Sequence, residues 1–118
     1  MSITNIQASE AFELANNGTI FVDVREVAET NCNQYDLKNV TYIPLSLFEL
    51  KFREVLPKDK STKLIIACQA GGRSMMAATA LKKHGYSNVC NLVGGLSGWA
   101  MDGFPVKSGE NLHSKCGC

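Results

Sequence analysis

Residues 64–74 read Leu-Ile-Ile-Ala-Cys-Gln-Ala-Gly-Gly-Arg-Ser, and this stretch decides the fold. Its apolar beginning lies between a lysine and a glycine-containing loop, a pattern typical of a buried strand. Beyond the loop, Met75, Ala78 and Leu81 recur near helical spacing, and Gly85 is suited to end a helix. The sequence therefore predicts a strand, a short loop and a helix, with Cys68 at the carboxyl end of the strand.

This position of Cys68 favours an anionic thiol. Ligands of open α/β sheets bind at the carboxyl ends of strands, where a helix N-terminus offers unpaired N–H groups and a positive dipole. Gly71 and Gly72 allow the loop to direct several N–H groups at one centre, and Arg73 adds a positive charge at its rim. We therefore expect the pKa of Cys68 to lie below the value of about 8.5 for a free thiol.

The rest of the chain alternates between strand and helix patterns. Strands are expected over 19–24, 41–43 and 88–92, and helices over 8–15, after a capping box formed by Ser46 and Glu49, and around Trp99. Residues 27–38 are polar, and we expect a loop with one helical turn there. The sequence predicts an α/β domain with a mainly parallel sheet over residues 1–107, followed by a flexible, cysteine-containing tail over residues 108–118.

Length and composition indicate one domain without an evident macromolecular partner. Twelve basic and eleven acidic residues give a net charge of +1, which implies no attraction to nucleic acid or to a membrane surface. No apolar run suggests a signal peptide or a membrane span. The spacing of the five cysteines suggests no disulfide framework and favours the reducing cytoplasm. Trp99 is expected in the core, and Cys32 and Cys90 are expected to be inert.

Five short motifs occur in order between residues 6 and 109. They are Asp23-Val24-Arg25 followed by Glu29, Ile43-Pro44-Leu45, the segment from Cys68 to Ser74, Gly94-Gly95 followed by Gly98-Trp99, and Gly103-Phe104-Pro105-Val106. In this order and at these spacings they resemble the rhodanese (sulfurtransferase) family in its single-domain form. The resemblance implies a mainly parallel five-stranded sheet flanked by helices on both faces. It also implies that Cys68 takes a sulfane sulfur from a donor, becomes a persulfide and passes the sulfur to an acceptor.

The resemblance also assigns roles to individual residues. Cys68 is the catalytic residue, and the substrate-binding loop consists of Gln69, Ala70, Gly71, Gly72, Arg73 and Ser74. Asp23 and Arg25 are expected to brace the fold beside the site. No cofactor or metal is expected. The expected partners are a small-molecule sulfur donor such as thiosulfate, a thiol or cyanide acceptor, and a sulfur-relay protein as a further candidate. Residues 35–42 depart from the family pattern. In the family this segment forms the wall of the domain beside the site.

Three other functions are alternatives to sulfur transfer. A thiol redox protein would pair Cys68 with Cys116 and Cys118, two tail thiols that could equally act as a relay for its sulfur. A cysteine-based phosphatase or arsenate reductase needs five residues between its cysteine and arginine, whereas four separate Cys68 from Arg73. A catalytically silent binding module would lack the cysteine that this chain retains.

Overall fold

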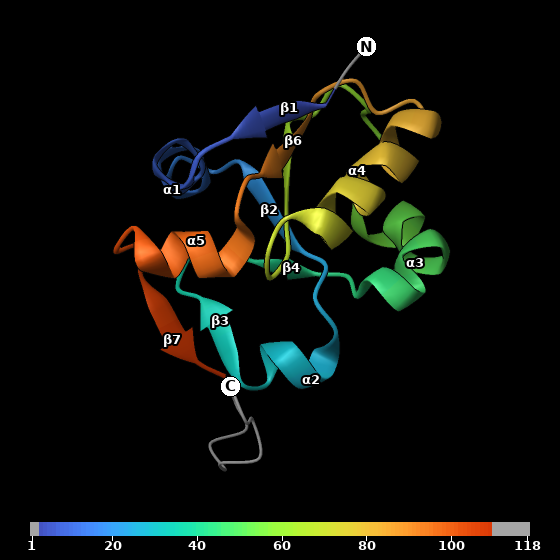
Figure 1. The fold of residues 1–118 in the computed structure, drawn as a ribbon. Coiled ribbons are helices and arrows are strands. Elements are labelled where there is room, and N and C mark those ends of the chain that lie inside the picture. Colours follow the sequence, from blue (N-terminus) through green and yellow to red (C-terminus); the bar gives the residue numbers. More distant parts are fainter. Residues whose placement is uncertain (1–2, 110–118) are drawn as a thin grey trace.

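A computed structural model describes residues 3–109, and its centre is a five-stranded sheet (Figure 1). The strands are β1 (Thr4–Ile6), β2 (Ile20–Asp23), β4 (Thr41–Tyr42), β5 (Leu64–Ala67) and β6 (Val89–Leu92). They lie in the order β1-β6-β5-β2-β4, and every neighbouring pair is parallel. The predicted parallel sheet is confirmed, and β1 adds an edge strand that the sequence did not indicate.

Side chains that alternate along the central strands divide the core into two layers. Because successive residues of a strand point to opposite faces, Phe21 and Ile65 pack into one layer while Val22 and Ile66 pack into the other. The first layer is covered by α1 (Ala8–Asn16) and α5 (Gly95–Met101), and the second by α3 (Phe48–Val55) and α4 (Gly72–Lys83) (Figure 1). Helices thus flank both faces, as predicted. Within residues 3–109, no helix combines the length and apolar character needed to cross a membrane.

A second, two-stranded sheet lies outside the main one. Strand β3 (Asn33–Tyr35) pairs antiparallel with β7 (Val106–Ser108), and α2 (Val27–Thr30) precedes β3. The sequence predicted only a loop with a helical turn over 27–38, because the polar residues of β3 have no strand pattern and their partner lies near the end of the chain. The backbone N–H of Gly109 donates to Cys32 O at 3.0 Å, so the chain follows the domain to Gly109.

The predicted capping box at Ser46 and Glu49 is wrong. A short 3₁₀ helix, η1 (Leu45–Leu47), leads into α3, and the Ser46 hydroxyl donates to Glu26 Oε1 at 2.7 Å. The capping box of this chain is formed instead by Glu26 and Glu29 at the start of α2. The Glu26 carboxylate therefore caps α2 and also binds the entry to α3, which fixes two elements beside the Cys68 loop.

Candidate active site

Cys68 lies one residue beyond β5, where the chain turns into α4. It is buried, with 1% of its surface exposed, and its Sγ accepts a hydrogen bond of 3.0 Å from the backbone N–H of Gly71. Gly71 has a φ of 107°, a left-handed conformation that residues with a Cβ rarely adopt. The glycine predicted to turn the loop inward therefore supplies an N–H group directly to the sulfur.

Ser74, in the first turn of α4, provides a second partner for the sulfur. Its Oγ lies 3.4 Å from Cys68 Sγ, 3.1 Å from Gly71 O and 2.5 Å from Asn91 Oδ1. A hydroxyl carries one proton, so a neutral Cys68 donates to Ser74 while Ser74 donates to an amide or carbonyl oxygen. When Cys68 is a thiolate, the same hydroxyl can rotate and donate to the sulfur.

The pKa of Cys68 is lowered from the ordinary value of a thiol. Burial opposes this shift, because it disfavours the charged thiolate. Burial is the largest single effect, but four hydrogen bonds together outweigh it. They are donated by the Ser74 side chain and by the backbone N–H groups of Ser74, Gly71 and Ala70. The structure thus agrees with the direction of the shift expected from the sequence.

The carbonyl of Cys68 is held from the other side by two further elements. Tyr35 of β3 donates its hydroxyl to Cys68 O at 2.6 Å, and the N–H of Leu96 in α5 donates to the same oxygen at 2.9 Å. Burial raises the pKa of Tyr35, so its hydroxyl stays protonated as a donor. Tyr35 packs edge-on against Trp99, which is fully buried, as predicted. Neither donor to this carbonyl was expected from the sequence.

Gly95 allows α5 to approach the loop this closely. A Cβ at this position would lie 2.5 Å from Cys68 O and from the carbonyl carbon of Gln69, and the φ of Gly95 is 57°. Both the space and the backbone conformation therefore exclude an ordinary side chain. The Gly94-Gly95 pair in the sequence was the available signal that a second segment packs on the cysteine loop.

Asp23 and Arg25 form a fully buried ion pair at the carboxyl end of β2. The Arg25 guanidinium binds the Asp23 carboxylate at 3.0 Å, Asn33 O at 2.8 Å and Gln69 Oε1 at 3.3 Å. Through these contacts Arg25 connects β2, β3 and the cysteine loop. This geometry fits the bracing role expected of the two residues, and neither is in hydrogen-bond contact with the sulfur among the contacts of the described chain.

The Arg73 side chain forms an ion pair with the Glu29 carboxylate. Its two terminal nitrogens bind the two oxygens of Glu29 at 2.6 and 2.7 Å, and about a third of each side chain is exposed. The hydrogen bonds from Arg73 lower the pKa of Glu29, against the effect of its partial burial. Arg73 therefore connects α4 to α2. Both residues belong to the motifs found in the sequence, but their contact was not expected from it.

The remaining predicted residues differ in how they lie relative to the sulfur. Gln69 is half-buried and donates through Nε2 to Ser97 Oγ at 3.1 Å, while Ala70 and Gly72 are exposed. Cys116 and Cys118 lie outside the described residues, so their role as a relay stays a prediction. No group of three or more histidine, cysteine or acidic side chains is placed to hold a metal ion in residues 3–109. The arrangement as a whole can stabilise a sulfur nucleophile and an anionic sulfur bound to it.

Comparisons with known proteins agree with this geometry. The model of the Rhodanese-like domain family matches residues 7–102. Rhodanese-like domain-containing protein 17 of Arabidopsis thaliana is 31% identical over 114 residues, covering 89% of this chain and 73% of that protein. A sulfurtransferase of Allochromatium vinosum is 34% identical over 91 residues, covering 77% and 80%. The crystal structure of a rhodanese-related protein from Thermoplasma volcanium matches with a TM-score of 0.76 at 29% identity, covering 87% and 96%. This chain therefore belongs to the rhodanese-like domain family.

Proposed function

We propose that this protein is a sulfurtransferase that carries a sulfane sulfur on Cys68 as a persulfide. The observation that supports it most is the set of donors around Cys68 Sγ. The N–H of Gly71 at 3.0 Å and the hydroxyl of Ser74 at 3.4 Å lie beside a thiol whose pKa is lowered. Such donors stabilise the attacking thiolate and the anionic terminal sulfur of the persulfide alike.

The proposed reaction has two steps, and neither needs an external oxidant or reductant. In the first, the Cys68 thiolate attacks the outer sulfur of thiosulfate, a new S–S bond forms, and sulfite leaves with the electron pair of the broken bond. In the second, cyanide or an acceptor thiolate attacks the terminal sulfur of the persulfide, and Cys68 leaves as a thiolate. A covalent intermediate divides one difficult transfer into two easier displacements.

The size of the loop favours sulfur over a tetrahedral oxyanion. Four residues separate Cys68 from Arg73, one fewer than phosphatase-type loops use. The guanidinium of Arg73 is also bound to Glu29 through both of its terminal nitrogens, so its charge is shared with that carboxylate. The alternative of a thiol redox protein depends on Cys116 and Cys118, and the contacts of the described residues offer it no separate support.

Intact-mass analysis of the reduced protein tests the proposal. After incubation with thiosulfate, mercaptopyruvate or a polysulfide, we expect the wild type to gain one sulfur atom and to lose it on addition of cyanide. Cys68→Ser should gain none, while Cys90→Ala should behave as the wild type. The proposal is wrong if no donor adds sulfur to the wild type, or if Cys68→Ser still acquires a cyanide-labile sulfur. A cytoplasmic location, where thiols stay reduced, also remains a prediction.

A further inference from the structure

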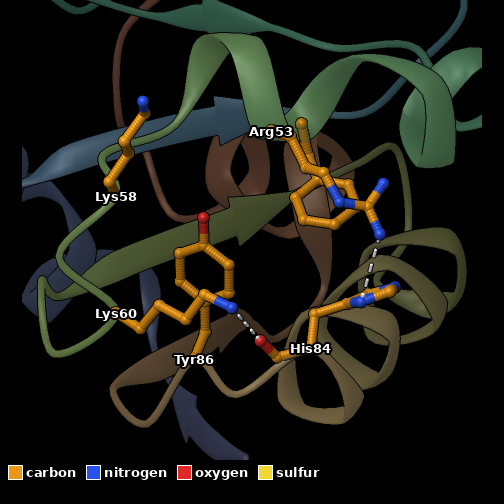
Figure 2. Close-up of a pocket in the computed structure, with 6 residues that line it drawn as sticks. Arg53, Lys58, Lys60, His84 and Tyr86 are labelled. Carbon is orange, nitrogen blue, oxygen red and sulfur yellow. Dashed lines mark hydrogen bonds between the residues drawn. The ribbon is translucent and has the colours of Figure 1, made fainter.

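A cavity of about 240 Å³ lies at the end of α4 opposite to the Cys68 loop (Figure 2). It is lined by Phe52, Arg53, Lys58, Lys60, His84 and Tyr86. Helix α4 begins at Gly72 beside Cys68 and ends just before His84, so its 12 residues separate the two places by about 18 Å. The cavity is therefore distinct from the site of sulfur chemistry.

Positive charge is concentrated in the chain segments that contribute the residues lining this cavity. Residues 49–63 together with residues 82–83 contain seven of the 12 basic residues of the chain but only three of its 11 acidic residues. The cavity itself is lined by Arg53, Lys58 and Lys60, and none of these takes part in an ion pair among residues 3–109. The net charge of +1 for the whole chain hides this local excess, which would attract an anion.

Two of the three cations are held in place by groups of the cavity wall. The Arg53 guanidinium lies 4.7 Å from the centroid of the Phe52 ring, and its Nη2 contacts His84 Nδ1 at 3.4 Å. Lys60 Nζ donates to His84 O at 2.6 Å and lies 5.6 Å from the centroid of the Tyr86 ring. Figure 2 shows the two cations reaching His84 from different sides of the cavity. Each keeps further N–H donors, because an ammonium has three and a guanidinium five.

The Glu49 carboxylate contacts His84, one of the residues that line the cavity. Arg53 is always a donor, so His84 Nδ1 must accept, and the ring proton then lies on Nε2. That nitrogen contacts Glu49 Oε1 at 3.2 Å and can donate to it. Glu49 thus keeps its negative charge but directs its carboxylate to the imidazole, and it forms no ion pair with Arg53, Lys58 or Lys60 among residues 3–109.

We propose that this cavity binds a small organic phosphate, with its dianionic group held by Arg53, Lys58 and Lys60. Guanidinium and ammonium groups are the usual partners of phosphate oxygens, and three cations suit a doubly charged group. A water molecule occupies about 30 Å³ of liquid volume. A cavity of about 240 Å³ therefore has room for more than a bare oxyanion. The organic part of the ligand would lie on the apolar wall formed by Phe52 and Tyr86. This inference does not depend on sulfur transfer at Cys68.

A titration of ¹⁵N-labelled protein with phenyl phosphate, followed by amide chemical shifts, tests the inference at constant ionic strength. We expect saturable shifts at Arg53, Lys60, His84 and Gly85. Inorganic phosphate and sulfate should bind the same residues more weakly, and phenol, which lacks the charge, should cause no shift there. Tighter binding of sulfate than of phenyl phosphate, shifts confined to the Gly71 and Gly72 amides, or no saturation would each contradict the proposal.

A pair of charge-matched variants separates a specific site from general attraction. Arg53→Gln combined with Lys58→Gln should weaken the binding of phenyl phosphate by at least about tenfold. Lys51→Gln combined with Lys107→Gln removes the same charge from exposed positions outside the cavity and should change the affinity by less than about twofold. An equal loss in both variants would overturn the proposal. Should the first variant unfold, Lys58→Gln alone, at an exposed position, must still weaken binding.

Discussion

Cys68 and Cys90 are both free, buried thiols, one just beyond β5 and the other inside the neighbouring strand β6, yet their environments have opposite effects on the thiol pKa. They are 1% and 3% exposed. Hydrogen bonds lower the pKa of Cys68, whereas burial raises the pKa of Cys90, an effect that Lys63 only partly opposes. Cys90 lies inside β6, whose backbone groups pair with β1 and β5. Cys68 lies one residue beyond β5, where N–H groups are available to the sulfur. Burial alone disfavours the thiolate, as at Cys90, whereas the donors at the strand end favour it at Cys68.

Replacing each of the two cysteines in turn should show the largest difference between them, measured as sulfurtransferase activity. We expect Cys68→Ser to reduce thiosulfate:cyanide sulfurtransferase activity by more than about a thousandfold, because the nucleophile is lost. Cys90→Ala, the matched control, should keep most of the activity. Thiocyanate formation in steady state measures both. Comparable losses in the two variants would mean that the difference between the two thiols does not determine activity.

Gly95→Ala should disturb the surroundings of Cys68 without touching those of Cys90. The added methyl group would meet Cys68 O and Gln69 at 2.5 Å, so the loop must move, at a cost of roughly 1–3 kcal/mol in the free energy of unfolding. Gly98→Ala, in the same helix, has its nearest neighbour at 3.8 Å and should be neutral or stabilising by up to about 1 kcal/mol. Urea unfolding of both variants checks this, and equal stabilities would show that the close approach of α5 is unimportant.

Ser74→Ala should raise the pKa of Cys68 and leave that of Cys90 unchanged. The variant removes a hydrogen bond that lowers the pKa of Cys68, so the thiolate fraction at neutral pH should fall and the rate of alkylation should reach its plateau at higher pH. Iodoacetamide labelling with peptide mapping between about pH 5 and 10 measures each thiol separately.

Thr79→Ala provides the control for this prediction. It removes a hydroxyl from the same helix that donates to Met75 O at an exposed position. The alkylation profile of Cys68 should then match that of the wild type. If Ser74→Ala also left this profile unchanged, the backbone N–H groups alone would account for the lowered pKa of Cys68.

The charges at the rim of the Cys68 loop should have the smallest effect. We expect Arg73→Ala to raise the KM for thiosulfate a few-fold, since partly exposed ion pairs contribute up to about 1 kcal/mol. The KM for an uncharged polysulfide donor should change less, and Arg73→Lys should recover part of the loss. Glu29→Gln, which releases the guanidinium, should lower the KM for thiosulfate. Equal losses for both donors in Arg73→Ala would instead indicate that Arg73 shapes the loop.

The sequence by itself was sufficient for the strand, loop and helix around Cys68. An apolar run followed by glycines and a helical pattern is a local signal, and the direction of the pKa shift follows from a cysteine at a strand end before a helix. The alternation of strand and helix patterns likewise predicted a mainly parallel sheet, and the family resemblance implied helices on both of its faces. These features depend on residues that are neighbours in the chain, so they can be read without the fold.

Only the tertiary structure decided which distant residues support the site. Tyr35 and Leu96 meet on the carbonyl of Cys68, and Glu29 meets Arg73, although none of these pairs is close in the sequence. The pairing of β3 with β7, which places Tyr35, joins a polar segment with no strand pattern to the far end of the domain. The cavity at the end of α4 likewise brings the cations of residues 53–60 together with His84 and Tyr86, which follow α4, so composition alone gave no sign of it. Side-chain packing in three dimensions selects such partners, and local sequence patterns contain no information about that packing.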